Sequence, residues 1–280
     1  MVVNALSVDV EDWFQVGAFE KVIDRADWDS LEHRVEANTD KVLALFDGAG
    51  VKATFFTLGW VAERYPALMR RIVAGGHEIA SHGWDHQRVF TLTPDQFRAD
   101  LARARATIED TSGAKVTGYR APSFSIDTRT PWAHAILAEA GYSYSSSVAP
   151  IRHDHYGWTD APRGAHRPVA GAELIELPIT IAKFAGKEVT TGGGFFRLLP
   201  GAVTRTAVDA ANKAQRPAVF YFHPWEVDPG QPRVANAPLK SKLRHYARLG
   251  AMAGKLKTLI AGHQWGRMDA IVAREAERLQ

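Results

Sequence analysis

Three carboxylates crowd the end of an apolar segment near the start of the chain. Asp9, Glu11 and Asp12 lie in "SVDVEDWFQV", residues 7–16. Carboxylates repel one another and are seldom fully buried without a partner. A bound cation would offset this repulsion, with one carboxylate as its ligand and a second left free as a base. The segment therefore points to metal-assisted acid–base chemistry.

Two histidines in "SHGWDH", residues 81–86, have the spacing of a metal-binding pair. Three residues separate His82 from His86, so a helical turn here would place both imidazoles on one face. Two neutral imidazoles and one carboxylate form a three-ligand set that leaves positions open for water and substrate. A divalent ion in such a set polarises a carbonyl group and lowers the pKa of its water.

The third ligand of this site is open between two of the acidic residues. Side chains alternate along a strand, so Asp9 and Glu11 share a face if the strand continues to residue 11, which favours Glu11. A bulge or turn at Val10 would favour Asp12, whose shorter side chain then needs no extra reach. We expect the acid that is not a ligand to support the ligand and the base through hydrogen bonds.

Two further apolar segments end in residues that suit the same chemistry. Arg120 precedes Pro122 in "YRAP" (119–122), and His223 follows the apolar run of "FYFHPWE" (220–226). The amine of an amide is a poor leaving group unless it is protonated. A histidine changes its charge near neutral pH, so His223 suits the role of general acid.

Tryptophans lie beside three of these motifs, at Trp13, Trp84 and Trp225. Most tryptophans pack in a core, but three beside the motifs favour a wall on which a sugar ring can stack. We expect Trp13 and Trp225, together with Pro122, to contact the substrate.

A sheet must position these motifs, because strand-like and helix-like segments alternate along the chain. Repeated alternation predicts a parallel α/β sheet, open or closed, with its site at the carboxyl ends of the strands. Residues 150–172, which include His153 and His155, resemble a long loop. We expect strands at 2–10, 51–59, 77–82, 115–122, 142–147, 174–179 and 217–224, and helices at 38–48, 60–74, 93–113, 130–141 and 200–214.

Composition excludes several classes of protein. The 280 residues suffice for one α/β barrel or two smaller domains, and 46% hydrophobic with 23% charged residues is typical of a folded globular chain. A formal net charge of only +3 does not favour nucleic acid as a partner. The chain has no cysteine, which excludes disulfides, thiolate metal sites and a cysteine nucleophile. The absence of G-x-S-x-G disfavours a serine hydrolase.

Charge is unevenly distributed near the end of the chain. Residues 230–268 contain no acidic residue, and their Lys and Arg residues fall within 233–267. This stretch indicates either a solvated helical surface or a face for anionic lipid carriers or polyanionic glycans, which would allow peripheral membrane contact. We find neither a signal peptide nor an apolar run long enough for a transmembrane segment, so we expect a cytoplasmic protein.

Together, the four motifs resemble those of the polysaccharide deacetylase family, the carbohydrate esterases with a NodB-like domain. In addition, "TGGGFFRLLP" (191–200) resembles a segment of the branch found with exopolysaccharide gene clusters of the exosortase type. The resemblance implies an α/β fold, a deformed and incomplete (β/α) barrel of the NodB-homology type. It implies a single domain over residues 1–280, with about 225–280 as a helical extension.

The resemblance also implies hydrolysis of N-acetyl groups on the amino sugars of a glycan, free or lipid-linked. It implies that Asp9 is the general base and that Arg120 orients it and balances its charge. His223 would be the general acid.

For the metal, the resemblance implies a divalent ion, usually Zn²⁺, held by His82 and His86 with a carboxylate from Glu11 or Asp12. Two departures from the family pattern concern this site. The first motif usually has two adjacent aspartates, whereas this chain reads Asp-Val-Glu-Asp. Ser145 stands where relatives often carry Asp, which puts the contacts of the family's fourth motif in doubt.

Two rival functions remain. A cyclic-amide hydrolase resembling the bacterial allantoinases would use the same scaffold, but the retained histidine pair and the glycan-type C-terminal half argue against it. A catalytically silent carbohydrate-binding protein would need no matched acid and base, whereas Asp9, Arg120 and His223 are all present.

Overall fold

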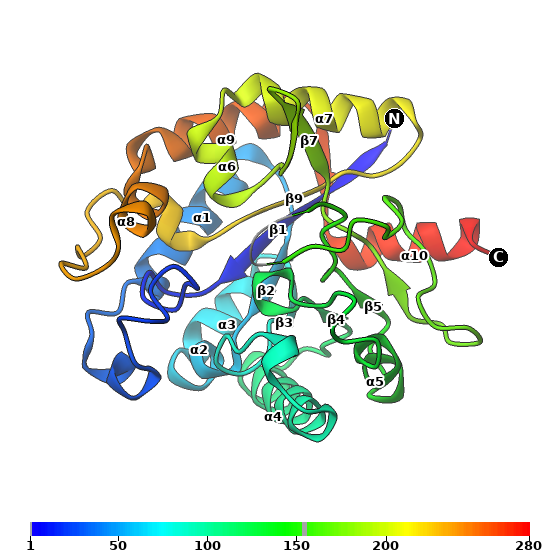
Figure 1. Ribbon diagram of the computed structural model, residues 1–280, viewed down its shortest axis with the longest axis horizontal. Coiled ribbons are helices and arrows are strands. Elements are labelled where there is room, and N and C mark those ends of the chain that lie inside the picture. The colour runs from blue at the N-terminus through cyan, green and yellow to red at the C-terminus, as the bar shows by residue number, and fades with distance from the viewer. Residues whose placement is uncertain (1, 153–155) are drawn as a thin grey trace.

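Eight strands form one parallel sheet, which runs through the centre of the molecule (Figure 1). The computed structural model describes residues 2–152 and 156–280, so His153 and His155 lie outside the described residues. The strand order is β10-β1-β2-β3-β4-β5-β6, and β9 also pairs with β1. The bounds are β1 (Val3–Val10), β2 (Thr54–Thr57), β3 (Glu78–Ser81), β4 (Gly118–Tyr119), β5 (Tyr144–Ser145), β6 (Ile175–Glu176), β9 (Val219–Phe222) and β10 (Gln264–Gly266).

The sheet curls into a barrel that strand pairing does not complete. Beyond β6, the amide of Thr180 donates to the carbonyl of Val219 in β9 at 3.2 Å, and the Val219 amide donates to the Thr180 hydroxyl at 2.8 Å. The chain after β6 therefore meets β9 at one residue, and no strand ladder joins β6 to β9 among the described residues. The expected α/β class and incomplete barrel are confirmed.

Helices cover the outside of this sheet (Figure 1). α4 begins where the sequence predicts, because Thr93 and Gln96 form a capping box and Pro94 occupies the first turn. The helix expected over 60–74 is two helices, because Pro66 lacks a backbone donor and restricts Tyr65 before it. The helices are α1 (Val35–Ala49), α2 (Gly59–Arg64), α3 (Pro66–Ala74), α4 (Pro94–Ser112), α5 (Ala133–Glu139) and α7 (Gly201–Lys213).

The later part of the chain contains elements that the sequence pattern did not predict. β7 (Ile181–Phe184) and β8 (Lys187–Thr190) form an antiparallel hairpin, followed by α6 (Gly193–Leu198). Residues 225–280 contain α8 (Leu239–Tyr246), α9 (Met252–Ala261) and α10 (Met268–Arg278), but they also supply β10. This region therefore extends the sheet itself and is not only a helical extension. None of the described helices has the length and apolar character needed to cross a bilayer.

Strand β1 separates two apolar cores and so aims its side chains in two directions. Leu6 and Val8 pack in the larger core, whereas Ala5 packs in a second cluster with Phe56 and Val219 of the neighbouring strands. Because strand side chains alternate, Ser7 and Asp9 continue the Ala5 row. The strand thus delivers Asp9 at its carboxyl end, on the side of the smaller core.

Candidate active site

The chain bends directly after β1, and this bend determines which of Glu11 and Asp12 lies next to the histidines. The amide of Glu11 donates to the carbonyl of Asp9 at 3.0 Å, which closes a tight turn around Val10. Glu11 is almost fully buried next to the two histidines of "SHGWDH".

Glu11, His82 and His86 each offer one potential ligand atom, and these atoms lie within 4.8 Å of one another. Nε2 of His86 is 2.9 Å from Oε2 of Glu11, and the two imidazole centroids are 5.6 Å apart. All three side chains are buried. The structure therefore brings the predicted histidine pair together with one of the two candidate carboxylates.

These residues fit a divalent cation. The Nδ1 of His82 donates to the carbonyl of Arg120 at 2.8 Å, which leaves Nε2 as the nitrogen with a lone pair. Burial lowers the pKa of His82 to about 4, so its imidazole is neutral at pH 7, as a ligand must be. Apart from the His86 contact at 2.9 Å, the buried Oε2 of Glu11 has no polar partner among the described residues, so it is available to a cation together with the histidines.

The helical turn expected at the histidine pair is not formed. Residues 82–88 have no regular structure, and both Gly83 (φ 76°) and His86 (φ 61°) adopt left-handed backbone conformations. The amide of Gly59 donates to the Gly83 carbonyl at 2.9 Å, and Asp100 accepts from the Trp84 amide at 3.1 Å. A bent loop held at two points, rather than a helix, thus aligns the imidazoles. His86 occupies a conformation that is uncommon outside glycine.

Asp12 lies outside the metal-ligand group and caps a helix instead. Its Oδ2 accepts from the amides of Arg34 at 2.7 Å and Val35 at 2.9 Å, at the start of α1. Its Oδ1 accepts from the amide of Trp13 at 2.8 Å. Burial raises the pKa of Asp12 to about 6 against these hydrogen bonds. The two acids that were candidates for the third ligand thus have different surroundings. Glu11 faces the histidines, whereas Asp12 accepts hydrogen bonds from amides at the start of α1 that have no partner within the helix.

Asp9 forms a buried ion pair with Arg120. Nη1 of Arg120 lies 2.6 Å from Oδ1 of Asp9 and also donates to the Ser7 hydroxyl at 2.8 Å. Nε and Nη2 of Arg120 donate to the carbonyl and the hydroxyl of Ser146 at 3.1 and 3.0 Å. The guanidinium is fully buried and cannot rotate without losing several of these bonds. The Asp9 carboxylate is therefore held by a guanidinium that is itself fixed by several hydrogen bonds.

His223 lies next to the carboxylate of the ligand set. Its Nε2 is 3.5 Å from Glu11 Oε1, and its Nδ1 is 3.1 Å from Glu226 Oε2. Burial by itself lowers the pKa of His223, but the charges of Glu11 and Glu226 and the Glu226 hydrogen bond outweigh burial and raise it to about 9. The two carboxylates thus favour the protonated form of His223.

Glu226 and Arg197 extend the site, although sequence reasoning assigned neither of them a role. Arg197 Nε donates to Glu226 Oε1 at 2.6 Å, and both side chains are buried. The other guanidinium nitrogens donate to the carbonyls of Arg244, His245 and Ala247 at 2.7–3.0 Å. The sequence feature that could have identified these two residues is the single charged residue in each of the apolar stretches "GGFFRLLP" and "FYFHPWE".

The expected substrate contacts at the tryptophans are not supported by their burial. Trp13 is 4% exposed and Trp225 is 5% exposed, so little ring surface is left for a sugar. Trp13 Nε1 donates to the carbonyl of Glu32 at 2.9 Å. Trp225 Nε1 donates to Glu11 Oε1 at 3.2 Å, and its ring stacks on His223 at 5.2 Å between centroids. Pro122 is buried as well. Trp225 thus contacts both Glu11 and His223.

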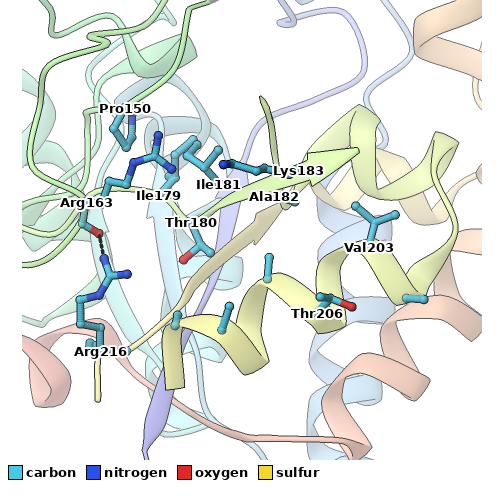
Figure 2. Close-up of a pocket in the computed structure, with 15 residues that line it drawn as sticks. Pro150, Arg163, Ile179, Thr180, Ile181, Ala182, Lys183, Val203, Thr206 and Arg216 are labelled. Carbon is cyan, nitrogen blue, oxygen red and sulfur yellow. Dashed lines mark hydrogen bonds between the residues drawn. The ribbon is translucent and has the colours of Figure 1, made fainter. Parts of the chain in front are cut away.

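A separate cavity of about 490 Å³ lies between β7 and α7 (Figure 2). Pro217, which lines it, precedes β9, whereas His223 follows that strand, so the cavity is at the opposite end of β9. Its described lining includes Arg163, Lys183 and Arg216 but no Asp, Glu or His. This cavity is therefore distinct from the candidate active site.

Comparison with known families divides the chain into two matched regions. Residues 27–145 match a family described as "Polysaccharide deacetylase", and residues 146–273 match "Domain of unknown function (DUF3473)". Both regions contribute strands to the same sheet.

Curated relatives carry deacetylase names. A chitooligosaccharide deacetylase of Bradyrhizobium sp. is 27% identical over 63% of this chain and 72% of its own length. A peptidoglycan deacetylase of Helicobacter pylori is 30% identical over 40% of this chain, and a chitin deacetylase of Cryptococcus neoformans is 30% identical over 39%. The matches span only 38% and 24% of the length of those last two proteins.

Solved structures share the fold. A Mycobacterium smegmatis crystal structure whose name proposes a polysaccharide deacetylase has a TM-score of 0.64 at 22% identity, over 99% of this chain and 91% of that one. A structure named Puue allantoinase has a TM-score of 0.62 at 16% identity, over 97% of this chain and 89% of that one. Since the scaffold is common to both, fold similarity alone does not separate the two reactions.

Proposed function

The chain carries a polysaccharide deacetylase domain, and from that premise we propose that it is a metal-dependent hydrolase that removes N-acetyl groups from amino sugars. One observation carries the proposal. A buried two-histidine, one-carboxylate set is accompanied by Asp9, which is paired with Arg120, and by His223, which is paired with Glu226 and lies 3.5 Å from Glu11. Amide hydrolysis at a cation requires a base for the attacking water and an acid for the leaving amine.

The roles of the side chains follow from this arrangement. Glu11, His82 and His86 would hold the ion, which supplies Lewis-acid polarisation of the amide carbonyl when it is bound. Asp9, held in place by Arg120, takes a proton from the attacking water. His223 gives a proton to the amine as the C–N bond breaks, so the products are acetate and a free amino sugar.

We further propose Zn²⁺ as the ion, since two imidazoles and a carboxylate are ligands that zinc accepts. We propose an exopolysaccharide or its biosynthetic intermediate in the cytoplasm as the substrate, because residues 191–200 resemble that branch of the family. The deacetylase names of the curated relatives support an N-acetylated glycan over a cyclic amide.

The direct test is acetate release. Purified zinc-loaded protein should release acetate from N-acetylglucosamine oligosaccharides, with appearance of an equal amount of free amine, and should leave allantoin intact. Ring opening of allantoin without acetate release would instead identify a cyclic-amide hydrolase. Oligosaccharide binding without either reaction would identify a silent binding protein.

His223→Ala should reduce hydrolysis of N-acetyl substrates far more than hydrolysis of an activated aryl acetate. An amine leaves only when it is protonated, whereas a phenolate leaves without help, so removal of an acid costs on the order of 10²–10⁴-fold on the amide alone. Parallel kcat measurements on both substrates give the ratio. Equal losses on the two substrates would leave His223 as a positioning residue.

Glu226→Gln provides a second variant in the same experiment. The amide keeps the size of the side chain but removes the charge that faces both His223 and Arg197. As a positioning residue, Glu226 should show the same preference for loss of amide hydrolysis, to a smaller extent. Because Arg197 is then buried without a carboxylate, thermal unfolding of this variant must be recorded beside the rates.

A further inference from the structure

Helix α8 presents two large apolar side chains to solvent. Leu239 is 71% exposed and Leu243 is 62% exposed, and they are four positions apart, so they share one face of the helix. The opposite face is packed, because His245 is buried and its ring stacks on Trp225 at 4.2 Å. The helix is therefore anchored to the protein by its buried face, while both leucines are exposed.

The stretch of chain that contains these leucines is rich in positive charge. The eight Lys and Arg residues between 229 and 268 have no acidic residue among them in the sequence. Among the described residues only one of the eight, Arg267, makes an ion pair with a carboxylate. Elsewhere, exposed arginines such as Arg71 and Arg98 are paired with carboxylates. Most of the positive charge in this stretch is thus not balanced by an ion pair within the part of the chain that the structure describes.

The exposed leucines and nearby cations form one surface, which we call the α8 face. It comprises Leu239, Lys240, Leu243, Arg244 and Arg248, all of them exposed. Arg248 Nη1 donates to the carbonyl of Leu198, which is 38% exposed and adds a third apolar side chain at this border. Figure 1 shows α8 at one edge of the molecule, on the side away from α10.

The α8 face is linked to the active site by short contacts. Arg197, which binds Glu226, also donates to the carbonyls of Arg244 and His245 in α8. Trp225 stacks on His245 and donates to Glu11. A partner surface that bound the α8 face would therefore hold the active site close to that partner surface, in one orientation.

We propose that the α8 face docks on an anionic lipid surface. Leu239 and Leu243 enter the boundary between headgroups and acyl chains, and the surrounding cations face anionic headgroups. A polyanionic glycan would complement the cations but would leave both leucines in water, so the apolar pair favours lipid. Two leucines and a few cations give weak, reversible binding. The inference goes beyond the proposed function, and it would bring the site to substrates attached to lipid.

Vesicle sedimentation tests the proposal without any measurement of catalysis. The full chain should sediment with vesicles of phosphatidylglycerol and phosphatidylcholine but not with phosphatidylcholine alone. Lys240→Gln with Arg248→Gln should lower the partition coefficient by roughly 30-fold, since each cation near an anionic surface contributes about 1 kcal/mol. Leu239→Ser with Leu243→Ser should lower it by roughly tenfold or more, while acetate release from soluble oligosaccharides stays unchanged.

Matched controls carry the same changes on other surfaces. Lys115 and Arg274 are exposed and have no carboxylate partner among the described residues, and Leu279 is 37% exposed. Lys115→Gln with Arg274→Gln, and separately Leu279→Ser, should leave sedimentation unchanged. Equal binding by the α8 variants and the controls would overturn the proposal. So would retention on a polyuronate resin in the absence of vesicle binding, which would identify a glycan-binding face.

The lack of native cysteine allows a direct test of insertion. Leu243→Cys, labelled with a fluorophore that brightens in apolar surroundings, should gain intensity on addition of anionic vesicles. Lys115→Cys carrying the same label should not. If the label at residue 243 does not respond while the protein sediments with the vesicles, the α8 face is not the contact surface.

Discussion

Replacement of His82 and His86 together by alanine should remove the divalent ion and lower turnover of N-acetylated oligosaccharides by about 10³-fold or more. The two imidazoles supply two of the three clustered ligand atoms, and Lewis-acid stabilisation of a transition state is worth several kcal/mol. Elemental analysis after purification under limiting zinc gives the metal count, and acetate release gives the rate. Full retention of the ion would show that the metal lies elsewhere.

Glu11→Gln and Asp12→Asn are a matched pair for the same site. Both substitutions remove a buried carboxylate charge, but only Glu11 faces the histidines, whereas Asp12 binds the amides of Arg34 and Val35. Glu11→Gln should lose zinc affinity strongly. Asp12→Asn should keep the ion and lower the free energy of unfolding by about 1 kcal/mol, as expected of a weakened helix cap. If Asp12→Asn lost zinc as strongly as Glu11→Gln, this ligand set would be wrong.

Asp9→Asn should keep the full metal count and lose activity on the order of 10²–10⁴-fold. Asparagine has nearly the size of aspartate and its oxygen can still accept from Arg120, but it cannot take a proton from water. The kcat on oligosaccharide, measured at saturating zinc, is the quantity to compare. Near-normal kcat in this variant would move the base role to another carboxylate.

Ser7→Ala is the control for Asp9→Asn. The Ser7 hydroxyl accepts from the same Arg120 nitrogen as Asp9, at 2.8 Å. Ser7 lies two residues before Asp9 in β1 and is therefore further from the end of the strand. Its removal perturbs the orientation of Arg120 without removing the base. We expect activity to fall by less than about tenfold, because one neutral partner of a multiply bonded guanidinium contributes on the order of 1 kcal/mol.

Much of the site could be predicted from the sequence because three motif residues come directly after strands. His82 follows β3, Arg120 follows β4 and His223 follows β9. Short apolar runs that alternate with helical segments indicate parallel strands, and the carboxyl ends of such strands lie at one edge of a sheet. Local periodicity was therefore sufficient to predict that these three residues lie close together. It was also sufficient for α4, whose capping box and terminal glycine are local signals.

Other features depended on partners that are distant in the sequence. Asp12 caps α1 because Arg34 and Val35, more than twenty residues later, begin that helix against it. Glu226 holds His223 because Arg197 reaches it from α6. Neither contact produces a periodic pattern in the sequence, because each forms only when separate elements of the fold pack together.

The sequence by itself thus determined the fold class and the chemical types of the site, because hydrophobic periodicity and strand ends are local properties of the chain. The tertiary structure decided which of two neighbouring acids joins the histidines, through the turn that brings the Glu11 amide to the Asp9 carbonyl. It also decided that Trp225 is buried beside Glu11, whereas Leu239 and Leu243 are exposed. The physical reason is that burial depends on what packs against a side chain, and those neighbours come from remote parts of the chain.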